Sequence, residues 1–278
     1  MRDRLVKIWS ILSGIVVVLI ILFVFLYSLV KGFKVINLAF IFKGPQGMPL
    51  GTEGGIFPAI VGSAYTGILS GLIASVLGIG SAIYLVFYCN SKRLYSLLVL
   101  SIQGISGIPS VVIGLFGYSF LIVRLNIPRS VLAASITLAI MIIPFISLRV
   151  EKIFKEVDRD IIDASLNLGV SKIHTIFKIV LPQTINKILS SIIVGVFYGI
   201  GAAAPIMFTG AVLIGKSSPG VLEPFMALPY HLYGLVSEGI SMEMAYGTAA
   251  VLMIMLIGTN LVCRILVGGD KYGQANRN

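Results

Sequence analysis

The stretch "DASLNLGVSKIHTIFKIVLPQ", residues 163–183, is the most polar long segment of a chain that is otherwise almost entirely apolar. Apolar residues recur at helical spacing on both sides of Gly169. The pattern predicts two short helices joined at Gly169, with Ser171 as the N-cap of the second helix. Pro182 marks the point where that second helix bends or restarts. A polar helical hairpin in such a chain requires an explanation.

The composition identifies an integral membrane protein. Of the 278 residues, 57% are hydrophobic and 12% are charged, and the mean hydropathy is +1.02. A soluble globular domain carries about 25% charged residues. The two cysteines, Cys89 and Cys263, are too few for a disulfide framework and lie near predicted cytosolic helix ends. Neither a metal nor a cofactor is expected, because the two histidines lie in different loops without other metal-ligating side chains nearby.

Charge-free runs long enough to cross a bilayer predict six transmembrane helices and an all-α fold, since a span needs about 20 apolar residues. The runs are 8–30, 54–91, 94–123, 130–148, 188–215 and 244–263. The first run exceeds the apolar core of a signal peptide and is followed by no small-residue cleavage pattern, so it is expected to remain as a span. Pro109 is a candidate break within the third helix.

The basic residues predict that both termini lie in the cytosol. With the N-terminus inside, most Lys and Arg residues fall in cytosolic segments, as the positive-inside rule requires. This topology accounts for most of the net charge of +10 and removes the case for a nucleic-acid partner. The hairpin then lies in a cytosolic loop, residues 149–187, between the fourth and fifth spans. By periodicity alone it either rests on lipid headgroups or fits a groove on a soluble partner.

Two spans carry small residues at every fourth position. Such stripes allow helix backbones to approach closely, so close packing is their expected role. The residues are Ser63, Gly67, Gly71 and Ser75 on the second span, and Ser191, Gly195, Gly199 and Ala203 on the fifth.

The hairpin resembles the EAA loop of ABC-importer permeases, which reads E-A-A, three residues, G, about nine residues, then an aliphatic residue and L-P. The matching residues are 163–165, Gly169 and 179–182, with Asp and Ser replacing the usual Glu and second Ala. Other segments resemble the phosphate-importer permeases of PstA type. They are "GGIFPAIVGSAYTGIL" (54–69), "LGIGSAIYL" (77–85), "GIPSVVIGLFG" (107–117), "GAAAPIMFTGA" (201–211) and "PFMALPYHLY" (224–233). The resemblance covers residues 54–268.

The resemblance implies a type I ABC importer permease with a MetI-like core and a cytosolic coupling hairpin. Residues 1–53 would form an N-terminal span and external linker, 54–268 the core with an external loop at 205–243, and 269–278 a cytosolic tail. The implied partners are a PstC-like second permease, two PstB-like cytosolic ATPase subunits and a PstS-like external phosphate-binding protein. The location would be a bacterial or archaeal cytoplasmic membrane.

The same resemblance implies which residues couple transport to ATP. The hairpin would dock into a cleft of one ATPase subunit and carry its closure to the spans. The candidate coupling residues are Asp163, Ala164, Ser165, Leu168, Gly169, Val170, Ile173, Leu181 and Pro182.

The fifth span departs from the family pattern R-x-x-G-E-T-A-P, because Tyr198 and Ala202 stand where the family has Arg and Glu. An anion path through this chain would then use hydroxyls, amides, backbone N–H groups and helix N-termini. The candidates are Gln103, Ser106, Pro109, Ser110, Tyr198, Ala202 and Thr209. The structural alternative for each hydroxyl is a hydrogen bond within its own helix. We expect a neutral wall here, with charge supplied by the partner permease.

The sequence therefore favours a non-catalytic transport subunit for phosphate that forms half of the translocation path, with ATP hydrolysis carried out by the partner. Two alternatives stay within the same kind of complex: a permease for molybdate, tungstate or sulfate, and a scaffold or sensing subunit. A further alternative is an unrelated membrane scaffold whose loop lies on lipid, which predicts no ATPase partner.

Overall fold

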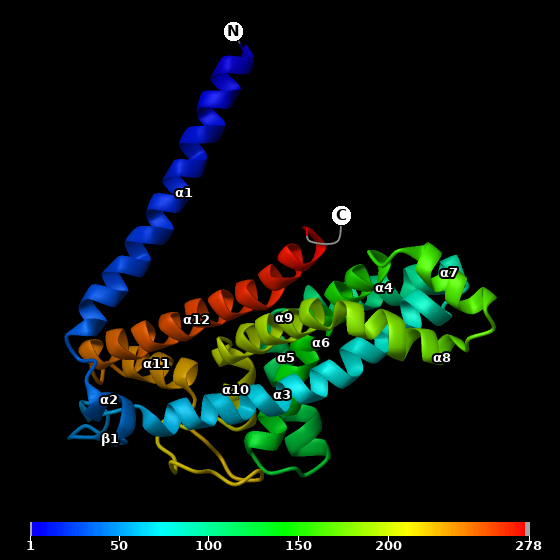
Figure 1. Ribbon diagram of the computed structural model, residues 1–278. Coiled ribbons are helices and arrows are strands. Elements are labelled where there is room, and N and C mark those ends of the chain that lie inside the picture. Colours follow the sequence, from blue (N-terminus) through cyan, green and yellow to red (C-terminus); the bar gives the residue numbers. More distant parts are fainter. Residues whose placement is uncertain (1, 276–278) are drawn as a thin grey trace. The chain divides into compact units, whose positions relative to one another are not determined.

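The computed structural model describes the backbone of residues 2–275 and the side chains of Arg4, residues 6–259 and Leu261. It is mainly helical, with two short strands (Figure 1). The chain divides into two compact units, residues 1–57 with 231–255 and residues 58–230 with 256–278. The described helices include five that are long and apolar enough to cross a membrane, or six when one bent pair counts as a span.

The first unit holds α1 (Arg2–Phe33), α2 (Leu38–Phe42), α11 (Leu228–Ser237) from His231 onward, and the start of α12 (Met242–Ala275). The strands β1 (Pro45–Gln46) and β2 (Glu53–Gly54) form an antiparallel pair with Pro45 opposite Gly54. Phe40 is buried, and a Cβ added to Gly247 would lie 2.8 Å from the Phe40 ring. The apolar window of α1 has no buried residues within the described chain.

The second unit is organised around α6 (Val131–Lys155). Every fourth residue along one face of α6 is fully buried, as at Leu138, Ile142 and Ile146. The predicted small-residue stripes lie where helices pack. A Cβ on Gly199 of α9 (Leu181–Ile200) would come within 2.5 Å of Ile142. A Cβ on Gly71 of α3 (Phe57–Ile83) would come within 2.4 Å of Val196 on α9. The expected packing role is thus confirmed.

The third predicted span is broken. The helices α4 (Lys92–Ser106) and α5 (Ser110–Gly117), the latter continued by the π-helical turn η2 (Tyr118–Arg124), meet at an angle of 94°. Pro109 has no N–H to donate and its ring would collide with the carbonyl of Ile105 in a continuous helix. The backbone of the residue before a proline also avoids the helical region. The suspected break at Pro109 is confirmed.

The fifth predicted span, 188–215, is wrong at both ends. A helix runs from α8 (Lys172–Thr175) through the π-helical turn η3 (Ile176–Val180) into α9, 29 residues in all. Pro182 does not interrupt it and lies in the first turn of α9, directly after the π-helical turn η3. The chain then leaves the helix at Ile200, and α10 (Ala203–Thr209) is separate. Pro205 prevents continuation, since its ring would collide with the carbonyl of Gly201.

The remaining spans follow the prediction more closely. The second, the helix Phe57–Tyr88, includes the π-helical turn η1 (Tyr84–Tyr88). The fourth helix continues past its predicted end at Leu148 to Lys155, so the loop to the hairpin is shorter than residues 149–187. The division into 1–53, 54–268 and 269–278 stays a prediction.

Candidate functional site

The hairpin, residues 157–182, is built by local capping. Its first helix, α7 (Arg159–Asn167), is capped by the Asp158 carboxylate, which accepts the Asp160 backbone N–H at 3.0 Å. Gly169 follows with φ +78°, a left-handed conformation that suits glycine. The Ser171 hydroxyl then accepts the backbone N–H of His174 at 3.4 Å and caps α8. The helix–glycine–helix prediction is therefore confirmed, including Ser171 as the cap.

One buried hydrogen bond joins the two helices of the hairpin. The hydroxyls of Ser165 on α7 and Thr175 on α8 lie 2.9 Å apart. Both residues are buried, so the bond is shielded from competing water. Ser165, predicted to contact the ATPase, thus faces the other helix of the hairpin and sets the angle between the two.

The outer side of the hairpin is apolar and exposed. Leu168 is 84% exposed, Ile173 63% and Phe177 59%. On the same apolar face of the second helix, Ile176 and Val180 are fully buried. The apolar face expected from the sequence is thus divided, with one part packed against the protein and the other left without a partner in the described chain.

Polar contacts attach the hairpin and its flanks to the neighbouring helices. The Lys172 ammonium donates to the carbonyl of Phe87 at 2.7 Å and lies 5.2 Å from the centroid of the Tyr88 ring. At the start of the hairpin, the Lys155 ammonium lies 2.6 Å from the Glu151 carboxylate. Tyr95 of α4 donates to the same carboxylate. These bonds tie α8 to η1 and α6 to α4, so the hairpin is anchored to the ends of several spans.

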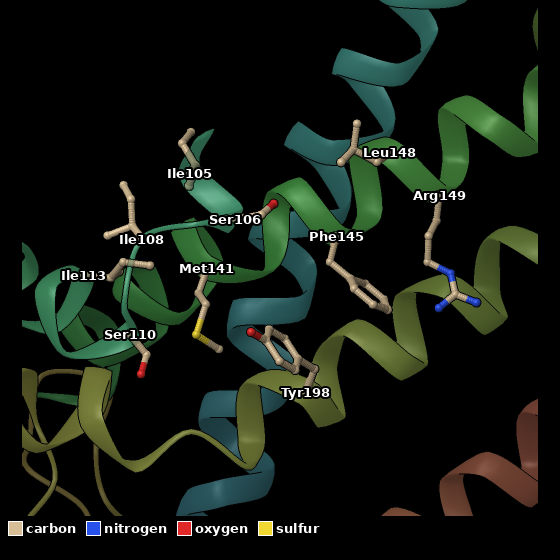
Figure 2. A pocket seen from close by; sticks show the side chains of 10 residues that line it. All are labelled: Ile105, Ser106, Ile108, Ser110, Ile113, Met141, Phe145, Leu148, Arg149 and Tyr198. Atoms are coloured by element: carbon tan, nitrogen blue, oxygen red, sulfur yellow. The ribbon is translucent and has the colours of Figure 1, made fainter. Parts of the chain in front are cut away.

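A cavity of about 410 Å³ opens where the broken third span faces α6 and α9 (Figure 2). Three residues of the predicted path line it: Ser106 at the end of α4, Ser110 at the start of α5 and Tyr198 on α9. The rest of the lining is Ile105, Ile108, Ile113, Met141, Phe145, Leu148 and Arg149. The break at Pro109 therefore places two serine hydroxyls at one cavity.

The cavity wall also carries a stack of three side chains. The Arg149 guanidinium lies 5.0 Å from the centroid of the Phe145 ring. The rings of Phe145 and Tyr198 are stacked, with centroids 6.0 Å apart and planes at 15°. Figure 2 shows the Phe145 ring between the guanidinium and the Tyr198 ring. Arg149 thus adds a cationic group from α6 to a lining in which Tyr198 is neutral, and the expectation of a neutral wall on the fifth span stays a prediction.

The sequence of this chain also matches a known protein family. Residues 89–268 match the family described as "Binding-protein-dependent transport system inner membrane component". The chain belongs to this family. As an inner membrane component it is a multi-pass membrane protein, and the resemblance to ABC-importer permeases is confirmed.

Individual relatives extend the match. The chain is 25% identical to "Probable ABC transporter permease protein YqgI" of Bacillus subtilis, over 92% of this chain and 91% of that protein. It is 30% identical to "Probable phosphate transport system permease protein PstA" of Methanocaldococcus jannaschii, over 79% and 78%. Its fold resembles a chain of the inward-facing MetNI methionine ABC transporter, with a TM-score of 0.62, 19% identity and coverage of 77% and 96%. The MetI-like fold is confirmed.

The other candidate path residues of this permease lie apart from the cavity lining. Gln103 is exposed on α4, and Ala202 is half-buried at the break between α9 and α10. Thr209 is fully buried, and its hydroxyl donates to the carbonyl of Pro205 at 2.9 Å. For Thr209 the structure shows the intrahelical bond that was the structural alternative.

Sequence reasoning did not identify Arg149 or Phe145 as residues of the site. Arg149 was counted as the charge that ends the fourth span, although the helix continues to Lys155. An ionisable residue within a membrane helix is uncommon and often functional. The four-residue spacing of Phe145 and Arg149 places both on one face of a helix, and this signal was present in the sequence.

Proposed function

We propose that this permease is a transport subunit of an ATP-driven importer for inorganic phosphate. Its hairpin would couple it to a cytosolic ATPase, which carries out the hydrolysis. The relative from Methanocaldococcus jannaschii named as a phosphate transport system permease supports the substrate. The observation that carries the coupling role is the exposed apolar side of a hairpin fixed by internal bonds.

The hairpin has the properties of a docking element for a soluble protein. Leu168, Ile173 and Phe177 present apolar surface, while Asp163 is exposed on α7 beside them in sequence. An apolar helix face of this kind suits a groove on a partner. Ser165 and Gly169 would position these side chains. Leu181 and Pro182 would join the hairpin to α9, and the proposed partner is an ABC ATPase.

The translocation path of this half would pass the cavity between the broken third span and α9. Ser106, Ser110 and Tyr198 line it and supply hydroxyl donors. The proposed complex also contains a second permease, a second ATPase and an external phosphate-binding protein. Selection of the anion would rest with the binding protein, since a passage needs only brief binding.

The topology test uses introduced cysteines. With both termini in the cytosol, a cysteine replacing Ser217 or Ser218 should react with a membrane-impermeant thiol reagent added to intact cells. A cysteine replacing Lys172 should react only after the membrane is opened. Each is made in a variant lacking Cys89 and Cys263. Reaction of the Lys172 position in intact cells would overturn the orientation.

The transport test uses the complex that copurifies with this chain, reconstituted in proteoliposomes. ATP-dependent accumulation of phosphate is expected when the external binding protein is present. The control replaces ATP with ADP, which should leave only passive leakage. Copurification without an ATPase would remove both the coupling role and the importer assignment.

A second oxyanion is a specific alternative, because Tyr198 and Ala202 stand where phosphate permeases resembling this chain carry Arg and Glu. Competition by unlabelled sulfate, molybdate or tungstate separates the candidates. Unlabelled phosphate should inhibit the uptake of labelled phosphate more strongly than any of these anions. Transport of molybdate without phosphate transport would reject the phosphate assignment and retain the importer.

A further inference from the structure

The lining of the cavity carries the Arg149 guanidinium in addition to neutral side chains. We propose that Arg149 forms a binding station for a tetrahedral oxyanion within this subunit, in a cavity that the hydroxyls of Ser106 and Ser110 also line. The proposal rests on the proposed importer function and adds a cationic residue to its path. It replaces the expectation that all charge comes from a partner permease.

The first support is that Arg149 has no carboxylate partner among the residues the structure describes. The two acidic residues that follow it in the sequence are engaged elsewhere. Glu151 pairs with Lys155 at 2.6 Å and accepts from Tyr95, while Glu156 pairs with Lys187 at 3.4 Å. The Arg149 side chain is exposed, so its charge is accessible to an anion that enters the cavity.

The second support is the way the guanidinium is held. The guanidinium carbon lies 5.0 Å from the centroid of the Phe145 ring. Phe145 in turn stacks on Tyr198, so the ring that contacts the guanidinium is itself supported. A stacked guanidinium keeps its N–H donors free at the edge, in a fork that matches two oxygens of a phosphate or sulfate. The Phe145–Tyr198 pair therefore positions the group without consuming its hydrogen bonds.

The third support is the pair of serines across the cavity. The Ser110 hydroxyl makes no hydrogen bond to a described residue. The Ser106 hydroxyl makes one long bond of 3.4 Å to the carbonyl of Ile102. A hydroxyl in a weak bond can turn to donate to an anion. The apolar remainder of the lining lowers the local dielectric, which strengthens each of these contacts.

A second cavity continues the route. It measures about 370 Å³ and shares Arg149 with the first. Its other lining residues are Lys152, Ile153, Glu156, Lys187, Ser190 and Ser191. The Lys152 ammonium thus stands one helical turn beyond Arg149. Lys187 is already paired with Glu156, so Lys152 supplies the net positive charge there. An anion leaving Arg149 would meet Lys152 next, toward the predicted cytosolic side.

The experiment compares Arg149→Gln, Arg149→Lys and the control Arg93→Gln in the reconstituted complex. Arg93 begins α4 and lines none of the cavities described above. Arg149→Gln should lower phosphate uptake about ten- to a hundredfold, the range for a lost hydrogen bond to a charged group. Arg149→Lys should recover part of it, since a lysine keeps the charge without the fork. Arg93→Gln should transport as the parent does.

A binding measurement separates the station from a folding defect. A cysteine replacing Ser106 is alkylated in the complex with and without inorganic phosphate at constant ionic strength. Phosphate should slow alkylation, and Arg149→Gln should abolish the protection. The same assay in vesicles of phosphatidylcholine alone, and of phosphatidylcholine with phosphatidylglycerol, distinguishes a free anion from a lipid headgroup. Protection that depends on phosphatidylglycerol and not on phosphate would overturn the proposal.

The outcomes for this station and for the proposed function are distinct. If the parent complex transports phosphate and Arg149→Gln does so equally well, the station is wrong while the importer stands. If the parent transports molybdate or sulfate and not phosphate, the substrate assignment fails. The Arg149 variants are then tested with the anion that is transported, and unchanged transport of it would overturn the station.

Discussion

Pro109 and Pro182 both lie within long helical stretches, yet they have opposite effects on their helices. At Pro109 the third span bends by 94°. At Pro182 the helix from Lys172 to Ile200 continues. The difference lies in the preceding turn. The helix α4 ends at Ser106, three residues before Pro109, whereas the π-helical turn η3 leads directly into α9, and Pro182 lies in the first turn of α9. The two prolines thus differ in whether the preceding turn remains helical.

The broken third span and the continuous helix from Lys172 to Ile200 contribute differently to the cavity. The broken span places Ser106, at the end of α4, and Ser110, at the start of α5, in the lining of one cavity. The continuous helix joins the hairpin at one end to Tyr198 near the other, in the wall of the same cavity. The broken third span thus forms part of the cavity lining, and the continuous helix connects that lining to the hairpin.

The largest expected effect comes from removing the break. Pro109→Ala restores a backbone donor and removes the ring, a change of about 3 kcal/mol in favour of a continuous helix. The cavity should narrow, and phosphate uptake should fall by more than tenfold. Uptake, together with thiol labelling of a cysteine replacing Ser110, measures this. Pro128→Ala, in the exposed loop before α6, is the matched proline control. Full uptake with an unchanged labelling rate would show that the bend does not depend on Pro109.

A smaller effect is expected at the tip of the hairpin. Gly169→Leu places a side chain at φ +78°, at a cost of about 1–2 kcal/mol. A Cβ there meets no atom within 4 Å, so the backbone alone carries the strain. The variant should assemble poorly with the ATPase or hydrolyse ATP without matching transport. Gly169→Asn is the control, because asparagine tolerates this conformation. Equal uptake and equal ATP hydrolysis in Gly169→Leu and in the parent would contradict the coupling role.

The smallest effect is expected where the two regions meet. Tyr198→Phe removes one hydroxyl, worth about 0.5–1.5 kcal/mol, and keeps the ring that stacks on Phe145. Uptake should fall only modestly. Tyr198→Ala removes the ring as well and should reduce uptake further, because Phe145 loses its support for Arg149. Complete loss of transport in Tyr198→Phe would mean that the hydroxyl itself is indispensable.

The hairpin was predictable because its determinants are local. Gly169 and Ser171 each act on the backbone within three residues, so spacing alone predicts their roles. The cavity was not predictable in the same way, since its residues come from α4, α5, α6 and α9. Charge-free runs also misplaced Arg149, because a helix near a membrane surface can continue through charged residues. The resemblance identified the family, while only the three-dimensional arrangement placed Arg149 in the same cavity lining as Ser106 and Ser110.

The uninterrupted helix from Lys172 to Ile200 also imposes a thermodynamic reciprocity. If ATPase docking at Leu168 and Ile173 shifts this helix and thereby alters the cavity around Tyr198, the two binding equilibria share one coupling free energy. An oxyanion in the cavity must then change the affinity of the hairpin for the ATPase by the same factor as the ATPase changes the affinity for the oxyanion. Under that condition, anion occupancy would be reported to the cytosolic face in the absence of any nucleotide, and the permease would act as a sensor of its own load.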